Sequence, residues 1–156
     1  MGMDDRLDLL TLTMVVARLT RVEADRRARQ HGMTRAQWGI LIHLQRQPGL
    51  SQKELADLLE VEPISVARLV DRLEKVGLVE RRADAQDRRI WRLHLRPDAA
   101  PLMDEIDRHR REITGLVTAG MSEAEQEAVI NALRSMKANL LQRPGMVCPV
   151  TQKETA

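Results

Sequence analysis

The sequence has almost no aromatic side chains and a single cysteine. Its 156 residues include two Trp, no Phe and no Tyr, although apolar residues make up 43% of the chain. A core must therefore be filled by the aliphatic side chains of Leu, Val, Ile, Ala and Met. The one cysteine, Cys148, excludes an intrachain disulfide and is typical of a reducing compartment.

Long hydrophobic runs are also missing. No stretch approaches the roughly 18 uncharged apolar residues that a membrane-spanning helix needs. The first residues, MGMDDRL, are charged and acidic, which is unlike a secretion signal. We therefore expect a soluble cytoplasmic protein that has no membrane partner.

Motifs of catalysis and of metal or cofactor binding are absent as well. The chain has no glycine-rich phosphate loop, and its Ser, His and Asp residues form no nucleophile–base pattern. Cys148 has no histidine at the spacing of a zinc site, and no HExxH motif occurs. The four histidines are scattered along the sequence, at His31, His43, His94 and His109. We expect no enzyme, no cofactor and no bound metal.

The most informative stretch is residues 51–96, which has the pattern of two short helices followed by a hairpin. Ser51 and Glu54 have the spacing of a capping box, in which hydroxyl and carboxylate satisfy backbone N–H groups at a helix start. Pro63 suits the first turn of a second helix, where its missing N–H costs nothing. Gly77 suits the end of that helix, where a left-handed residue is favoured.

The second helix is predicted to have one apolar and one polar face. Its apolar positions recur at helical spacing and are Val66, Leu69, Val70 and Leu73. The opposite face carries Ser65, Arg68, Arg72 and Lys75. The helix should therefore bury one side and present a basic side to solvent.

Beyond this helix the hydrophobic period changes from about 3.6 to 2, which indicates a strand. Trp91, Leu93 and Leu95 alternate with polar residues, so we expect these three side chains on the buried side. Residues 78–82 would form the antiparallel partner. The connecting loop has no glycine, so its turn should depend on Asp84 and Asp87, whose side chains can accept from their own backbone.

Positive charge is concentrated in this module. Residues 63–96 contain nine Lys or Arg and five Asp or Glu, an excess of four, whereas the whole chain carries a net charge of only +2. A basic helix beside an arginine-tipped hairpin suits a DNA duplex, which offers a major groove to one element and the backbone or minor groove to the other.

The flanking segments are predicted to be helical. Residues 7–30 form one long helix, Thr34 and Gln37 cap a second, and Pro97 and Ser122 begin two more. In the last helix an apolar stripe recurs at Val129, Leu133, Met136 and Leu140. Pairing of the terminal helices of two subunits would cover this stripe. Folding back onto the same subunit is the alternative.

The residues of the module resemble the MarR family of winged-helix transcription regulators. The resemblance rests on LEKVGLVERR at 73–82 and DAQDRR at 84–89, and it extends over about residues 7–141. MTRAQW at 33–38 and the segment from Ala99 to Ile106 are similar to the SlyA-like branch. The implied fold is mainly α with a small β-hairpin wing: a winged helix-turn-helix with N- and C-terminal dimerisation helices.

The resemblance implies three parts and a tail. Residues 1–32 and 97–142 would be dimerisation helices, and residues 33–96 the DNA-binding lobe. Residues 143–156, which have two prolines, a Pro–Gly pair and no periodicity, are interpreted as a mobile tail.

The same resemblance assigns DNA contacts to the second helix and the wing. Pro63 begins the helix, Ser65, Val66 and Arg68 are candidates for base edges, and Arg72 for a phosphate. Ile64 separates the proline from the serine, which departs from the usual family pattern. An ordinary solvated helix face is the alternative.

At the wing tip the resemblance implies that Arg89 enters the minor groove, that Asp87 supports it and that Arg88 contacts the backbone. Arg82, together with Arg81 and Arg92, would add phosphate contacts. Gln86 stands where many relatives carry another arginine. A solvated turn is the alternative here.

SlyA-like relatives bind aromatic or acyl acids in a cleft between the dimerisation helices and the DNA lobe. Thr34 and Trp38 match that region, Arg18 could neutralise a carboxylate, and His43 and His109 are further candidates. Trp38 as a core residue is the alternative. Cys148 is interpreted as an inert thiol, with a redox switch as the alternative.

The sequence thus predicts a homodimeric, sequence-specific DNA-binding repressor, relieved by a small aromatic or acyl carboxylate, on a pseudo-palindromic operator. Two alternatives stay open. One is a nucleoid-like or counter-silencing binder of broad specificity, and the other is a protein-interaction adaptor that does not bind DNA.

Overall fold

The computed structural model describes residues 3–143, with side chains from residue 8 onward. The predicted tail and Cys148 fall outside the described residues, apart from Arg143. The described part contains six α-helices, a 3₁₀ turn and a small sheet. The helices are α1 (Met3–Gln30), α2 (Arg35–Arg46), α3 (Gln52–Leu59), α4 (Pro63–Lys75), α5 (Ala100–Val117) and α6 (Glu123–Leu141). The other elements are β1 (Leu50–Ser51), β2 (Val79–Ala83), β3 (Trp91–Leu95) and η1 (Pro97–Ala99).

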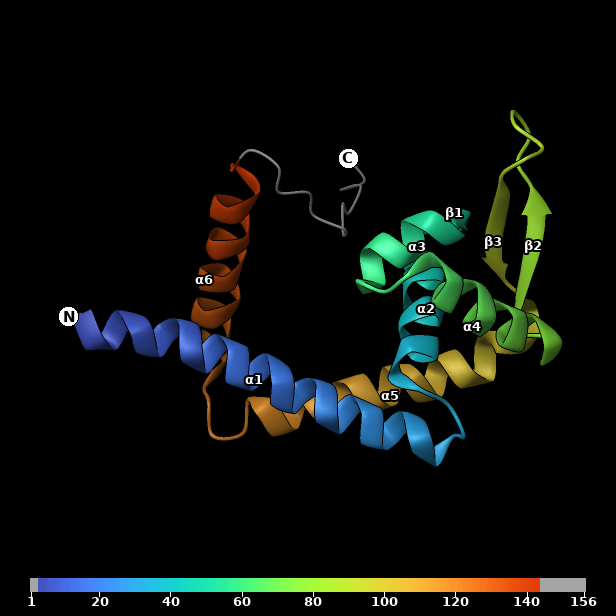
Figure 1. Ribbon diagram of the computed structural model, residues 1–156. Coiled ribbons are helices and arrows are strands. Elements are labelled where there is room, and N and C mark those ends of the chain that lie inside the picture. Colours follow the sequence, from blue (N-terminus) through green and yellow to red (C-terminus); the bar gives the residue numbers. More distant parts are fainter. Residues whose placement is uncertain (1–2, 144–156) are drawn as a thin grey trace.

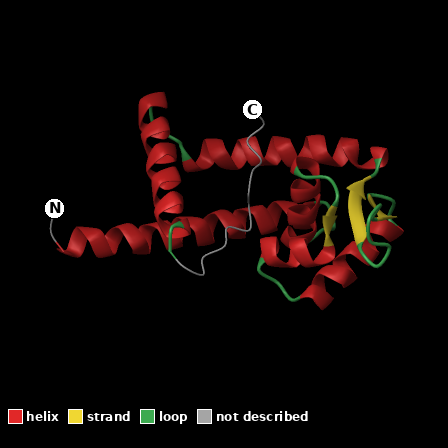
Figure 2. Ribbon diagram, turned by 90° about the horizontal axis from the view of Figure 1, so that it is seen from above, coloured by secondary structure: helices red, strands yellow, loops and turns green. Residues whose placement is uncertain are grey.

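The molecule has a base of two long helices and a lobe at one end of it. Helices α1 and α5 lie side by side, and α6 crosses near the amino-terminal half of α1 (Figures 1 and 2). At the other end, α2, α3, α4 and the sheet pack together into the lobe, with the β2–β3 hairpin projecting from it (Figure 1). The prediction of a mainly helical winged fold is confirmed.

Three helices begin at the capping boxes that the sequence predicts. The caps are Thr34 for α2, Ser51 for α3 and Ser122 for α6. At α3, the Ser51 hydroxyl accepts from the Glu54 amide at 3.2 Å, and the Glu54 carboxylate accepts from the Ser51 amide at 2.7 Å. Each box satisfies two backbone donors that the helix itself cannot use, which fixes where the helix starts.

The turn of the helix-turn-helix is tight and carries backbone strain. Glu60 ends α3 in the left-handed region with φ +53°, a conformation that favours glycine. Pro63 then begins α4 as its first residue, as predicted. Helices α2 and α3 approach closely at Gly39 of α2, which has no side chain. A Cβ there would lie 2.7 Å from Leu59 Cδ2 of α3. The sequence thus brings α2, α3 and α4 into one compact unit.

The sheet has one strand more than predicted. Strands β2 and β3 form the expected antiparallel hairpin, with Val79 opposite Leu95 and Ala83 opposite Trp91. The additional strand β1 pairs with β3 on its other side, so that the order in the described part of the chain is β1-β3-β2. This two-residue strand is too short for the period-2 pattern that reveals strands in a sequence.

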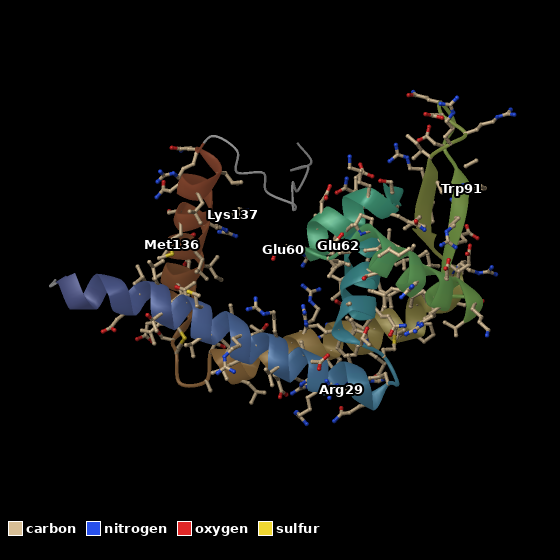
Figure 3. All side chains as sticks on the ribbon, viewed as in Figure 1. Arg29, Glu60, Glu62, Trp91, Met136 and Lys137 are labelled. Carbon is tan, nitrogen blue, oxygen red and sulfur yellow. The ribbon has the colours of Figure 1, made fainter. Side chains whose placement is uncertain are left out.

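One prediction about the hairpin is wrong. Leu93 is fully buried, but Trp91 is 51% exposed. Trp91 lies opposite Ala83 at the outer end of the hairpin, beyond the part of the sheet that packs against the helices (Figure 3). Strand alternation chooses the face of a side chain, but it does not show how far the core extends under the strand.

The core is aliphatic, as the composition requires, and it gathers in and beneath the lobe. Its largest fully buried side chains are Ile40, Leu41, Leu44, Leu55, Leu73, Leu93 and Ile106. In the described chain, α6 buries no residue, although its stripe is strongly apolar. None of the helices in residues 3–143 combines the length and apolar character that crossing a membrane requires.

Candidate nucleic-acid interface

The exposed face of α4 carries most of the polar residues assigned to DNA. Pro63, Ser65, Arg68 and Arg72 are all exposed on this helix. Val66 is not available, because its side chain is fully buried in the core. Its assignment to a base edge is therefore corrected: Val66 belongs to the apolar face that holds α4 against the lobe.

The wing loop is built by aspartate side chains, as predicted. Asp84 Oδ1 accepts from the amides of Gln86 and Asp87 at 2.8 and 3.0 Å. Asp87 Oδ1 accepts from the amide of Arg89 at 3.0 Å. Asp87 thus accepts from the backbone amide of Arg89, and the ion pairs of the described residues include none between Asp87 and the Arg89 guanidinium. Arg88 and Arg89 are exposed at the tip, where side chains project beyond the lobe (Figure 3).

Arg92 connects the wing to the helix-turn-helix. Its Nε donates to Asp84 Oδ2 at 2.6 Å, and its Nη1 donates to Glu54 Oε2 at 3.1 Å. Its Nη1 also lies 3.4 Å from the carbonyl oxygen of Gly49. The hydrogen bond from Arg92, with the amides of Asp87 and Gln86, lowers the pKa of Asp84 to about 2. Asp84 is therefore ionised at neutral pH and holds both the loop and the arginine.

The arginines of the lobe divide into paired and unpaired groups. Arg81 pairs with Asp71 and Glu74, and Arg82 pairs with Glu80 through Nε at 2.7 Å. On α4 and the wing tip, four arginines make no ion pair with a carboxylate among the described residues and stand exposed: Arg68, Arg72, Arg88 and Arg89. Arg81 and Arg92 are thus engaged inside the protein, and a positive surface remains on α4 and the wing tip.

The residues assigned to an effector lie around two neighbouring clefts. Trp38 and His43 line a cleft of about 590 Å³, whose charged lining residues include Arg21, Arg35, Glu60 and Arg110. Arg18 lines the second cleft, of about 800 Å³, which shares Arg21 and Arg35 with the first. Thr34 lines neither cleft, and its hydroxyl caps α2. Burial, helped by the positive charge of Arg46, lowers the pKa of His43, so that its ring is neutral.

Trp38 is a core residue and a cleft wall at once. It is 3% exposed, and its ring stacks on His109 with centroids 5.6 Å apart and planes at 24°. His31 contacts both rings. Among the described residues, the buried Nε1 of Trp38 has no hydrogen-bond partner. An unsatisfied buried donor costs free energy. A ligand whose acceptor atom reached Trp38 Nε1 would gain binding free energy by satisfying this donor.

The sequence reading missed Arg21, Arg35 and Arg110 as cleft residues. Arg35 directly follows the cap of α2, and Arg110 follows His109 on α5, so only their helical faces could have suggested a shared site. His31 and His109, scattered in the sequence, lie in contact. No spacing rule reports a contact across 78 positions.

A helix-turn-helix whose second helix presents unpaired arginines, followed by an arginine-tipped hairpin, defines a winged helix-turn-helix protein. Comparison with known proteins makes the family explicit. The profile of the MarR family matches residues 31–90. The transcriptional regulator PA3341 has a solved structure that is 38% identical, with a TM-score of 0.76 over 86% of this chain and 99% of the other. The chain belongs to the MarR family of transcriptional regulators.

Two further solved structures show the extent of the likeness. The transcriptional regulator SlyA is 26% identical, with a TM-score of 0.72 over 85% of this chain and 93% of the other. A MarR family regulator from Listeria monocytogenes, solved in complex with a 26mer DNA, is 23% identical, with a TM-score of 0.72 over 84% of this chain and 87% of the other. Members of the family are transcriptional regulators and not enzymes, which agrees with the expectation from the motifs.

The pKa of Asp84 gives a test of the wing geometry. Because the folded pKa is lower than the ordinary value of about 3.9, ionised Asp84 stabilises the folded wing. This contribution is fully present above about pH 4 and is lost as the pH falls through about 2. We expect the side-chain carboxyl carbon of Asp84 to titrate near 2 in NMR, and Arg92→Gln to move the midpoint upward. A wild-type midpoint near 3.9 would show that the Arg92 contact does not form in solution.

Proposed function

We propose that this MarR family regulator is a homodimeric repressor that binds a pseudo-palindromic DNA site in the cytoplasm and is released by a small carboxylate. The observation that carries the DNA part is the set of four exposed, unpaired arginines on α4 and the wing tip. Unpaired cations can release counterions from phosphates on binding, whereas cations already held by carboxylates contribute less.

The site residues receive separate roles in this proposal. Ser65 and Arg68, one turn apart near the start of α4, reach base edges in the major groove, and Pro63 sets where that helix begins. Arg72 contacts a phosphate from the next turn. The L. monocytogenes relative was solved with a 26mer DNA, which supports DNA as the ligand here.

The wing acts on the neighbouring groove. Arg89 enters the minor groove with Asp87 holding its amide, and Arg88 contacts the backbone. Arg82 adds a weaker phosphate contact, because Glu80 already competes for its guanidinium.

A dimer follows from the apolar surface outside the lobe. We assign residues 1–32 and 97–142 to dimerisation and residues 33–96 to DNA binding. A groove of about 440 Å³ between α1 and α6 is lined almost wholly by apolar side chains, among them Leu9, Val16 and Leu133. Leu133 is 48% exposed, and many apolar side chains near it on α1 and α6 are also exposed. Exposed apolar surface on this scale marks an interface, and a second copy provides a matching surface.

The two-fold axis explains the form of the DNA site. Two copies of α4 related by such an axis would read half-sites separated by one turn of duplex, about 34–36 Å. A pseudo-palindromic operator is the sequence that matches this symmetry.

The effector part rests on the charge of the two clefts. Among the described residues, Arg18, Arg21 and Arg35 have no carboxylate partner within ion-pair distance. Trp38 offers an aromatic wall and His43 a neutral ring beside them. An aromatic or acyl carboxylate fits this combination of unpaired cations and apolar surface. Its binding between α1, α5 and α2 would select one spacing of the lobes and so change the affinity for DNA.

The DNA assignment predicts separate effects for two arginines. We expect Arg89→Ala to weaken binding to duplexes selected from a random pool and to reduce the log–log salt slope by about 0.9, with the dimer intact. Arg68→Ala should reduce discrimination at one base pair by about 1–3 kcal/mol. Fluorescence anisotropy measured over a range of salt concentrations checks both.

Arg111→Ala, an exposed arginine on α5, is the matched control and should change neither quantity. Equal affinity for scrambled duplex would support the broad-specificity binder. No binding even at low salt would support the protein-interaction adaptor.

The dimer predicts that a charge in the apolar groove separates the subunits. We expect Leu133→Glu to sediment as a monomer and to lose most DNA affinity, because a carboxylate in an apolar interface is costly. Lys137→Gln, an exposed position one turn away on α6, should remain dimeric (Figure 3). A monomeric wild-type protein in analytical ultracentrifugation would contradict this arrangement.

The effector cleft predicts selectivity for an anionic group. We expect benzoate to bind and to weaken DNA binding, while benzamide, of the same shape but uncharged, does neither. Arg35→Ala should lower the affinity for benzoate about tenfold, the order expected from one charged hydrogen bond. Isothermal titration checks this with Arg111→Ala as control. Equal binding of acid and amide would exclude charge recognition by the clefts.

A further inference from the structure

We propose that His31, Glu105 and His109 form a binding site for a divalent transition metal, with Zn²⁺ as the best-fitting ion. One ligand atom from each residue lies within 4.8 Å of the other two. The Nε2 atoms of the two histidines are only 3.0 Å apart. This site is independent of the DNA interface, and it joins the end of α1 to the middle of α5.

The backbone already supplies the geometry that such a site needs. Glu105 and His109 are four residues apart on α5, so they project from the same face of the helix. His31 is held in the turn after α1, where its amide donates to the Ala28 carbonyl at 3.0 Å. Two nitrogens bound to tetrahedral zinc at about 2.0–2.1 Å lie about 3.3 Å apart. The histidines therefore need to separate by only a few tenths of an ångström.

The surroundings orient the His109 ring. Trp38 stacks on it, and the residue is 8% exposed. His109 Nδ1 lies 3.1 Å from Arg27 Nη1 and 3.4 Å from Glu112 Oε2. In the metal-free protein Nδ1 accepts from Arg27, so the proton of His109 lies on Nε2. A metal on Nε2 requires the other tautomer, in which the Arg27 hydrogen bond is lost and Nδ1–H donates to Glu112. That pairing of a ligand histidine with a carboxylate is common around metals.

The charges near the site can accommodate the ion. Arg27 would be repelled by a divalent cation, but it is already held by Glu23 and Glu112. Glu105 now pairs with Arg108 on the same helix, and this pair must open for the carboxylate to reach the metal. Partly exposed ion pairs of this kind are weak, so opening the pair is a small obstacle.

The ligand set selects the class of metal. Two imidazoles with one carboxylate suit zinc and its first-row neighbours, whereas magnesium and calcium prefer oxygen alone. Three protein ligands leave a fourth position for water or a small anion. In the absence of metal, the same atoms form a histidine–histidine hydrogen bond, which is the competing explanation of the contact.

Zinc titration of the full-length, tag-free protein tests the site. The Trp91→Phe background leaves Trp38 as the reporter, because the chain has two Trp and Trp38 stacks on His109. We expect one Zn²⁺ per chain in competition with a chromophoric chelator and a change in Trp38 emission. His31→Ala and Glu105→Gln, both outside the core, should each lower the affinity at least tenfold.

The matched controls are His94→Ala on the wing and Cys148→Ser, and both should bind zinc like the wild type. Circular dichroism shows whether each variant is folded. Absence of zinc binding by the folded wild type would overturn the proposal. So would equal affinities of wild type, His31→Ala and Glu105→Gln, or loss of binding in Cys148→Ser alone.

Discussion

The exposed positive surface of α4 and the wing tip depends on how carboxylates are allocated among the arginines around it. Arg92 is the centre of that allocation, because it joins Asp84 of the wing loop to Glu54 at the start of α3. Both carboxylates also accept backbone N–H groups, so each performs two structural tasks. Acidic groups that would repel phosphates are thereby engaged within the protein. The remaining cations of α4 and the wing tip face solvent without a carboxylate partner. The positive surface consists of these unpaired arginines.

Apolar surface is allocated with a similar asymmetry. The lobe buries its aliphatic side chains within one chain, since α2, α3, α4 and the sheet provide enough neighbours. Helix α6 has no such neighbours in the described chain, and its apolar residues stay exposed beside those of α1. Removing apolar surface from water is the main favourable term in association. A chain that completes its core in one region and leaves apolar side chains exposed in another is suited to association through that exposed surface.

Local signals in the sequence predicted much of this architecture. The three capping boxes, the role of Pro63 and the aspartate-built wing turn each depend on residues a few positions apart, and each is present. The wrong or missing predictions concern packing between elements, which a local sequence pattern does not encode. Val66 shares the first turns of α4 with Ser65 but faces inward, and Trp91 extends past the core. The short strand β1 exists only because β3 lies beside it. Contacts between distant residues, such as His31 with His109, depend on packing of α1 against α5 and leave no mark on spacing.

Helix α2 is the element that can couple the proposed ligand sites to the proposed DNA surface. One of its sides contacts α1 and α5, where Trp38 meets His109, and the other packs against α3, α4 and β3. Because interiors are close-packed, a shift of α2 against α5 would be transmitted to α4, which packs against α2. An anion in the cleft and a metal at His31, Glu105 and His109 would both act on the junction of α2 with the helical base. A ligand changes DNA affinity only if it prefers one arrangement of that junction. In a dimer a small rotation at this junction would occur in both subunits. The change in spacing between the two α4 helices would then be twice the displacement of one helix.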